Sequence, residues 1–239
     1  VKDPPKEIPR KELHPNLPQL PCIMTIVAPT KSGKTNLLSN LLLRDDFYKD
    51  VHDNITIMSN SIESDVTGRF LRQACDCYTG YSDEVLGGII TQQKSFSNED
   101  RPFIGLVFDD ILGSVKRNSY LNSLVTRSRH FGVGLLAISV QSFKSLGPVI
   151  RNNCNAFICL NLQNMSELDK ISDEMSGMFG GDEKFRRIYH EATSERYDFL
   201  YLDLQSNPSR AFKNFNQLLA EGDKLHFGGG SMEKNKLED

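Results

Sequence analysis

A short stretch near the start of the sequence combines the groups that hold a polyphosphate. Four residues separate Ala28 from Gly33, and Lys34 and Thr35 follow at once, which is the Walker A spacing with alanine in place of the first glycine. In such a loop backbone N–H groups surround the phosphates, the lysine reaches the β- and γ-phosphates and the hydroxyl binds Mg²⁺. We therefore predict a nucleotide-binding loop of Ala28, Pro29, Thr30, Lys31, Ser32, Gly33, Lys34, Thr35 and Asn36.

Polar side chains end two later apolar runs. The apolar residues 106–108 lead into Asp109 and Asp110, as in a Walker B strand, whose first acid meets the Mg²⁺ held by Thr35. Asp110 is then placed to orient or deprotonate the attacking water. Gln141 follows the next apolar run, where its amide could sense the γ-phosphate or position the water. The simpler interpretations stay open: acids at strand ends also begin turns, and Gln141 could be an ordinary loop amide.

These side chains need a sheet that brings them to one edge. Because the predicted strands and helices alternate, we expect an α/β fold of the P-loop NTPase type, a mostly parallel central sheet flanked by helices on both faces. Ligands of such sheets bind beyond the carboxyl ends of the strands. The predicted strands are residues 23–27, 54–59, 103–110, 133–140, 156–160, 197–204 and 211–215, and the predicted helices begin at Lys34 and cover residues 63–77, 82–94, 114–131, 146–151, 166–179 and 182–192.

The length of 239 residues suits one such domain. Residues 1–21 are rich in proline and charge, which predicts an extended arm, either a flexible leader or a segment that packs on a neighbouring subunit. Residues 22–216 should form the ATPase domain. Residues 217–239, with Gly228-Gly229-Gly230 and a charged end, are predicted to be disordered.

Composition limits the possible partners and cofactors. The formal net charge is −3, so any contact with nucleic acid must come from a local basic patch or from an assembled ring. The five cysteines lack the paired spacing of a zinc site, and we expect reduced thiols in a cytosol-like compartment. We find no membrane span, no Asn-Lys-x-Asp run for guanine recognition and no set of kinase motifs. ATP with Mg²⁺ is the expected cofactor pair.

The order of the motifs resembles that of a known family. Residues 28–35, 106–110, 126–130 and 136–142 together resemble the genome-packaging ATPases of large DNA viruses and virophages, including the poxvirus type, which belong to the FtsK–HerA class of P-loop ATPases. The resemblance covers roughly residues 20–215. Two residues depart from the pattern, because Ala28 replaces a glycine and Asp110 stands where the wider class often has a glutamate.

The resemblance implies an ATP-driven motor that threads double-stranded DNA, without sequence specificity, into a preformed capsid. It implies a homo-oligomeric ring bound to a capsid vertex or portal component, located in the host cytoplasm at the viral factory and also in the virion. Gln141 would be the sensor. An arginine donated by the neighbouring subunit would complete the site, and Arg127 and Arg129 are the candidates, with a solvated basic helix end as the alternative.

Three questions stay open from the sequence. The residues that contact DNA could be Lys116, Arg117, Lys144, Arg186 or Arg187, although each could equally be a solvated side chain. A cellular FtsK/HerA-like DNA-translocating ATPase would carry the same motifs. A nucleotide-switched assembly module without motor activity would carry them as well.

Overall fold

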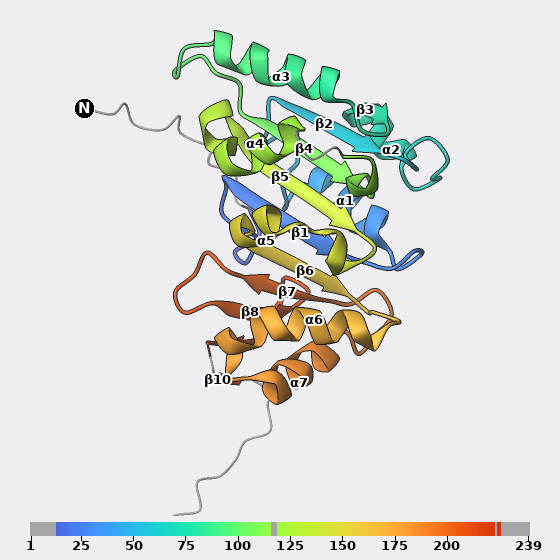
Figure 1. The fold of residues 1–239 in the computed structure, drawn as a ribbon, viewed down its shortest axis with the longest axis vertical. Coiled ribbons are helices and arrows are strands. Elements are labelled where there is room, and N and C mark those ends of the chain that lie inside the picture. Colours follow the sequence, from blue (N-terminus) through green and yellow to red (C-terminus); the bar gives the residue numbers. More distant parts are fainter. Residues whose placement is uncertain (1–12, 116–118, 223, 226–239) are drawn as a thin grey trace, which may run out of the picture.

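The apolar runs of the sequence form one ten-stranded sheet with the order β10-β9-β8-β7-β6-β1-β5-β4-β2-β3 (Figure 1). The computed structural model describes residues 13–115, 119–222 and 224–225. Strands β1 to β6 are parallel, and β7 to β10 run antiparallel to their neighbours. The strands are β1 (Cys22–Val27), β2 (Asn54–Ser59), β3 (Asp76–Thr79), β4 (Ile104–Asp109), β5 (Val133–Val140), β6 (Ala156–Leu160), β7 (Phe199–Asp203), β8 (Arg210–Lys213), β9 (Gln217–Glu221) and β10 (Lys224–Leu225).

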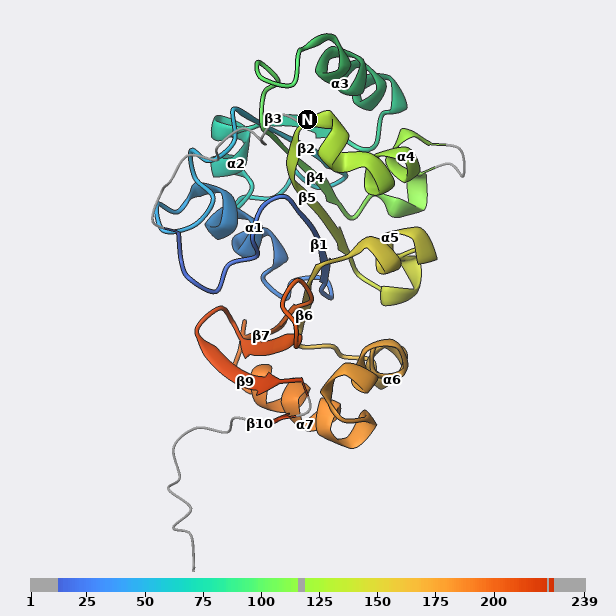
Figure 2. The same ribbon diagram turned by 90° about the vertical axis from the view of Figure 1, so that its left-hand side faces the viewer.

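Helices cover both faces of this sheet (Figure 2). Side chains of β1 alternate between two apolar clusters: Met24 packs in the cluster that contains residues of α1 and α2, and Ile23 packs in the cluster of α3 to α7. The predicted fold class, an α/β P-loop NTPase fold with a mostly parallel sheet, is therefore confirmed. The helices are α1 (Lys34–Leu43), α2 (Arg69–Ala74), α3 (Asp83–Ser95), α4 (Tyr120–Arg127), α5 (Pro148–Asn153), α6 (Met165–Met175) and α7 (Asp182–Ala192).

The register of the central strands positions the predicted site. Val27 lies beside Val140, and Asp109 lies beside Ser139, so the carboxyl ends of β1, β5 and β4 form one continuous edge. β5 is buried along its whole length, because helices pack on both of its faces. The residues that follow these strands therefore meet at one edge of the sheet.

The long helix predicted over residues 63–77 is wrong. Only α2 is helical there, and a strand, β3, follows it. The Asp65 carboxylate accepts the N–H of Thr67 at 2.8 Å, which holds the backbone in a turn in place of a first helical turn. Val66, which the helical spacing placed in the core, is 77% exposed. Of the apolar residues that were expected to form the buried helix face, only Leu71, in α2, is buried in the core.

The helix predicted over residues 114–131 is also shorter than expected. A 3₁₀ turn (Leu112–Ser114) precedes α4, and a second 3₁₀ turn (Ser128–Phe131) follows it. Gly132 ends this segment with φ 68°, the left-handed conformation that glycine adopts most readily. The segment 116–118 lies outside the described residues.

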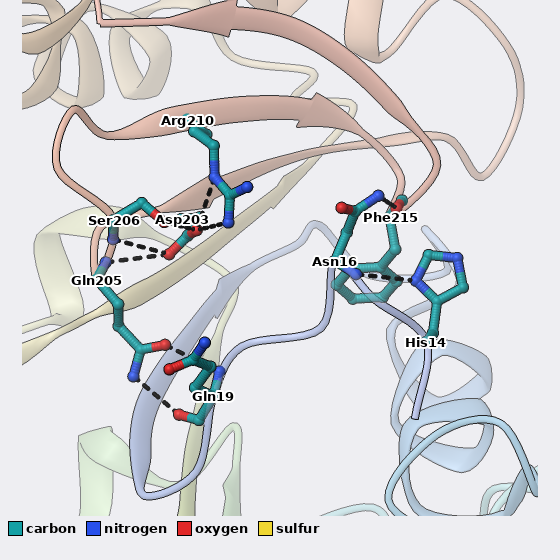
Figure 3. Close-up of polar contacts among 8 residues, drawn as sticks. All are labelled: His14, Asn16, Gln19, Asp203, Gln205, Ser206, Arg210 and Phe215. Atoms are coloured by element: carbon teal, nitrogen blue, oxygen red, sulfur yellow. Dashed lines mark hydrogen bonds and ion pairs between the residues drawn. The ribbon is translucent and has the colours of Figure 1, made fainter. Parts of the chain in front are cut away.

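The described part of the predicted arm, residues 13–21, packs on the C-terminal strands of the same chain (Figure 3). Asn16 Nδ2 donates to the carbonyl of Phe215 at 2.6 Å. Gln19 and Gln205 exchange two hydrogen bonds of 2.9 and 2.8 Å between backbone and side chain. This segment is thus part of the domain. Neither of the two predicted alternatives, a flexible leader or a segment that packs on a neighbouring subunit, describes it.

A buried carboxylate fixes the turn that the arm contacts (Figure 3). Asp203 is 5% exposed and accepts hydrogen bonds from Ser206 Oγ at 2.6 Å and from Arg210 Nη2 at 2.7 Å. Burial alone would raise the pKa of Asp203, but these donors and the N–H of Gln205 outweigh it and lower the pKa. The turn between β7 and β8 is therefore anchored to the sheet.

Part of the C-terminal segment that was predicted to be disordered belongs to the sheet. β9 pairs with β8, and its residues Leu219 and Ala220 are fully buried in the cluster that contains α7. The predicted domain boundary at residue 216 is therefore too early, because this apolar strand precedes the glycine-rich run. Residues 226–239 lie outside the described residues.

His52 is a largely buried titratable group. Its ring stacks on Phe103 at a centroid distance of 5.4 Å and meets Tyr48 edge-on at 6.2 Å. Neither ring nitrogen has a hydrogen-bond partner among the described residues. Burial lowers the pKa of His52 from 6.5 to about 4, and the nearby Asp53 only partly opposes this. The native chain therefore holds this imidazole neutral.

We expect mild acid to destabilise the fold through His52. The His52 imidazole binds a proton near pH 6.5 in the unfolded chain and near pH 4 in the native chain. Its contribution to stability is therefore complete above pH 6.5 and is lost as the pH falls towards 4. At pH 5 the free energy of unfolding should be lower than at pH 7 by about 2 kcal/mol. Urea titrations at both pH values measure it. His52→Phe should remove the difference, and an equal difference in that variant would disprove the assignment.

Candidate nucleotide site

In the phosphate loop between β1 and α1, Lys31 and Gly33 have positive φ angles. Their φ angles are 63° and 99°, and Gly33 is the residue directly before α1. The N–H of Ala28 donates to the carbonyl of Val140 at 2.9 Å, so Ala28 extends the β1–β5 ladder. A residue in this ladder need not be glycine. Alanine therefore suits the position, although the Walker A pattern has glycine there.

A cavity of about 710 Å³ lies over this loop at the carboxyl edge of the sheet. Its volume is in the range of small-molecule sites. Seven of the nine predicted loop residues line it; Ala28 is buried beneath the loop, and Ser32 turns its hydroxyl to the carbonyl of Pro29 at 2.6 Å. Beyond the loop, the lining includes Ser61, Asp65, Thr67, Asp110, Gln141 and Tyr197.

Lys34 and Asp109 form a nearly buried ion pair beneath the cavity. Lys34 Nζ lies 3.1 Å from Asp109 Oδ1, and the side chains are 13% and 6% exposed. Ser59 Oγ donates to Asp109 Oδ2 at 2.9 Å, and Ser139 Oγ donates to Oδ1. Two neighbouring strands thus hold the carboxylate in place, and the ammonium group of Lys34 compensates its charge.

The oxygen donors predicted for Mg²⁺ lie in the first turn of α1 and at the end of β4. The predicted ligands are the hydroxyl of Thr35 and the carboxylate of Asp109, and hard oxygen donors of this kind are what Mg²⁺ takes from proteins, together with phosphates. No group of three or more His, Cys, Asp or Glu that could hold a metal ion occurs among the described residues.

A chain of hydrogen bonds connects the three motifs. Thr30 Oγ1 donates to Gln141 Oε1 at 3.2 Å, and Gln141 Nε2 donates to Asp110 Oδ2. Asp110 has φ 56°, which turns the chain sharply after β4, and Asn60 Nδ2 supports its carbonyl at 2.9 Å. The structure thus brings Asp110 and Gln141 together at the cavity.

Four lining residues were not predicted from the sequence, namely Ser61, Asp65, Thr67 and Tyr197. Asp65 lies in the loop after β2, where a helix was predicted. Its partial burial would raise the pKa, but the Thr35 hydroxyl and the backbone N–H groups of Thr67 and Gly68 outweigh this and lower it. Tyr197 precedes β7 in a segment that resembles an ordinary strand start. Only its tertiary position shows that it reaches the phosphate loop.

Arg127 and Arg129 do not join this site. They line a separate cavity of about 250 Å³ beside the first residues of β1, at the amino edge of the sheet. The eight residues of β5 separate that edge from the phosphate loop by roughly 25 Å. Both arginines are exposed, and neither has an ion-pair partner among the described residues. Their predicted role across a subunit interface stays a prediction.

The candidate DNA-contacting residues differ in availability. Arg186 is held by Asp169 at 2.7 Å and Asp182 at 2.8 Å, so its guanidinium is already occupied. Lys144 is exposed, and the neighbouring Lys170, which is itself paired with Glu167, lowers its pKa. Lys116 and Arg117 lie outside the described residues.

Glu167 anchors the loop that follows Gln141. Its Oε2 accepts Ser142 Oγ at 3.0 Å and the N–H of Phe143 at 2.7 Å. Partial burial would raise the pKa of Glu167, but these bonds and Lys170 lower it. The carboxylate is therefore ionised at neutral pH and fixes where β5 ends.

We expect Glu167→Ala to lower kcat for nucleotide hydrolysis by about tenfold with little change in KM, because Gln141 would lose its fixed position. Steady-state kinetics measure both constants. Glu183→Ala is the matched control, since Glu183 also lies in the first turn of a helix, α7, but is exposed. A loss of the same size in the control would contradict this prediction.

The described residues also set limits on other sites. The five cysteines are free thiols. The described stretches contain no helix with the length and apolar character that a bilayer crossing requires.

The comparisons with known proteins rest on structure. No family model matches the sequence, and no curated protein matches it. The DNA-packaging ATPase B204 from Sulfolobus turreted icosahedral virus matches with a TM-score of 0.55 and 17% identity, over 84% of this chain and 99% of that chain. The genome packaging NTPase B204 from Sulfolobus turreted icosahedral virus 2, in complex with ATP-γS, matches with a TM-score of 0.54 and 17% identity, over 81% and 98%.

A third structure, the same NTPase in complex with AMPPCP, matches with a TM-score of 0.54 and 18% identity over 81% of this chain and 97% of that chain. At these identities the likeness is one of fold. It agrees with the resemblance that the order of the motifs indicated. The chain therefore has the P-loop NTPase fold of viral genome-packaging NTPases.

Proposed function

We propose that this chain is a Mg²⁺-dependent ATPase that translocates double-stranded viral DNA into a preformed capsid. The arrangement that carries the proposal is the meeting of Lys34, Asp109, Asp110 and Gln141 at one cavity. The fold likeness to the DNA-packaging ATPase B204, a nucleotide-binding protein in its ATP-γS complex, supports it.

Each residue of the site has a role in hydrolysis. The N–H groups of the loop bind phosphate oxygens, and Lys34 exchanges its contact with Asp109 for one with the β- and γ-phosphates. Asp110 accepts a proton from the attacking water, which the amide of Gln141 orients. Thr35 and Asp109 would hold Mg²⁺, which supplies charge neutralisation on the phosphates when it is bound.

The proposal is tested by the response of turnover to DNA. We expect ATP hydrolysis to rise on addition of double-stranded DNA of any sequence, and to rise less as salt increases, because grip on phosphates releases counterions. Phosphate release assays with two unrelated duplexes measure this. Slow hydrolysis indifferent to DNA, combined with nucleotide-dependent oligomerisation, would support a switched assembly module instead.

We further infer that the chain works as a homo-oligomeric ring. Arg127 and Arg129 lie too far from their own phosphate loop to act there, but a head-to-tail contact would place the amino edge of one sheet at the cavity of the next subunit. An arginine supplied in this way raises turnover by about 10³- to 10⁵-fold in related chemistry. The ring would dock on a capsid vertex or portal component in the host cytoplasm, at the viral factory, and in the virion.

Mixing inactive subunits tests this arrangement. Arg127→Ala and Arg129→Ala are made separately, and each inactive variant is mixed with Lys34→Ala. A Lys34→Ala subunit would donate its intact arginine to the intact phosphate loop of a neighbouring Arg→Ala subunit. Because each interface needs one subunit of each kind in the correct order, random mixing at equal amounts should restore about a quarter of the interfaces. No recovery of turnover at any ratio would refute both arginines as donated residues.

A further inference from the structure

The tyrosine that borders the nucleotide cavity has an unusual backbone conformation. Tyr197 has φ 72°, a region that bulky residues rarely adopt and that occurs often at ligand-binding sites. The next residue, Asp198, is held by Asn214 Nδ2 at 2.9 Å and by Lys213 Nζ at 2.9 Å. Asn214 in turn bonds to both backbone groups of Phe199. The sheet thus fixes Tyr197 from its C-terminal side.

The ring of Tyr197 lies directly against the phosphate loop. A Cβ atom on Gly33 would come within 2.9 Å of Tyr197 Cδ1, so the ring edge touches the loop where only glycine leaves room. The guanidinium of Arg196 lies over the ring at 4.7 Å from its centroid. Tyr197 nevertheless remains 53% exposed, which leaves aromatic surface open beside the loop.

The roles assigned to the other lining residues leave the base of a bound nucleotide without a protein partner. Lys34, Thr35 and the loop N–H groups suit the phosphates, and Asp110 and Gln141 suit the water. Of the described residues that line the cavity, Tyr197 alone is aromatic. Aromatic rings bind nucleobases by stacking, which works for any base because each has a π-face.

We propose that Tyr197 is the platform on which the base of the bound nucleoside triphosphate stacks, with Arg196 holding the ring in place by its cation–π contact. This inference rests on the nucleotide binding of the proposed function and adds to it the residue that recognises the base. Stacking on Tyr197 depends on the surface area of the base and does not recognise the hydrogen-bonding groups of the base. It therefore favours purine over pyrimidine nucleotides without separating ATP from GTP.

A tryptophan reporter tests the platform directly. The natural chain contains no tryptophan, so Tyr197→Trp places a single fluorophore at the site. We expect ATP and ADP to quench its emission and inorganic tripolyphosphate to leave it unchanged. Tyr120→Trp, at a tyrosine that is 50% exposed and outside the cavity lining, is the matched control and should not respond. Equal responses of Tyr197→Trp to ATP and tripolyphosphate would overturn the proposal.

Affinities provide the second readout. Tyr197→Ala should weaken ATP binding by about tenfold and reduce the preference for ATP over UTP, while Tyr197→Phe stays within about twofold of the natural chain. Binding of tripolyphosphate should be unchanged in both variants. If Tyr197→Ala weakens ATP and tripolyphosphate alike, or neither, Tyr197 is not a base platform. A natural chain that binds neither ligand would instead refute nucleotide binding itself, and with it the proposed function.

Discussion

Lys34→Ala is expected to lower ATP turnover by at least about 10³-fold, because Lys34 is the lysine that the Walker A spacing directs to the β- and γ-phosphates. In the structure Lys34 Nζ lies 3.1 Å from Asp109, so the ammonium group is already at the cavity. Phosphate release under saturating ATP measures the effect. Lys49→Ala is the control, since Lys49 forms an exposed surface pair with Asp45. Undiminished turnover in Lys34→Ala would show that the assigned site is wrong.

The same change has a second, separable effect on folding. Removal of Lys34 leaves the Asp109 carboxylate, which is 6% exposed, with the hydroxyl groups of Ser59 and Ser139 as its remaining partners in the part of the chain that the structure describes. We expect the free energy of unfolding to fall by about 1–3 kcal/mol. Lys34→Ala combined with Asp109→Asn should recover much of this stability and none of the activity. Denaturant unfolding of the single and double variants separates the two roles.

Asp110→Asn is expected to lower kcat by about 10²- to 10⁴-fold and to leave nucleotide affinity almost unchanged. Asparagine keeps the volume of the side chain and an oxygen that can accept the hydrogen bond from Gln141 Nε2, so the variant removes only the proton acceptor. Single-turnover kinetics together with a binding titration measure the two quantities.

Asp110→Glu is the companion variant, because it restores a carboxylate at the same edge of the sheet. We expect it to regain part of the lost rate. If Asp110→Asn hydrolyses ATP at the natural rate, the general base lies elsewhere, and Asp65, the other carboxylate in the described lining of the cavity, becomes the candidate to replace it.

The parallel core and the Walker-type motifs could be predicted because their signals are local. Apolar runs such as residues 133–140 are long and uninterrupted, and each motif follows directly on such a run. The positions of Asp109 and Gln141 at one edge then follow from the parallel arrangement alone. This prediction can be made without knowing which strands are neighbours in the sheet.

The rest depends on contacts between distant segments, which local patterns do not contain. Tyr197 reaches Gly33 only because β7 runs antiparallel to β6 and brings its start to the phosphate loop. The helix predicted over residues 63–77 failed because one side-chain hydrogen bond, from the N–H of Thr67 to Asp65, outweighs helical spacing. The C-terminal strand β9 was overlooked because the glycine-rich run after it dominates the composition of that segment.

The place of β1 in the sheet has a consequence for the order in which the site forms during protein synthesis. β1 and the phosphate loop leave the ribosome before β5 and β6, between which β1 lies in the sheet and which are made more than a hundred residues later. Until those strands emerge, the first strand has no neighbours to pair with. The nascent chain therefore cannot complete the edge of the sheet that holds the phosphate loop until both of these strands have been made.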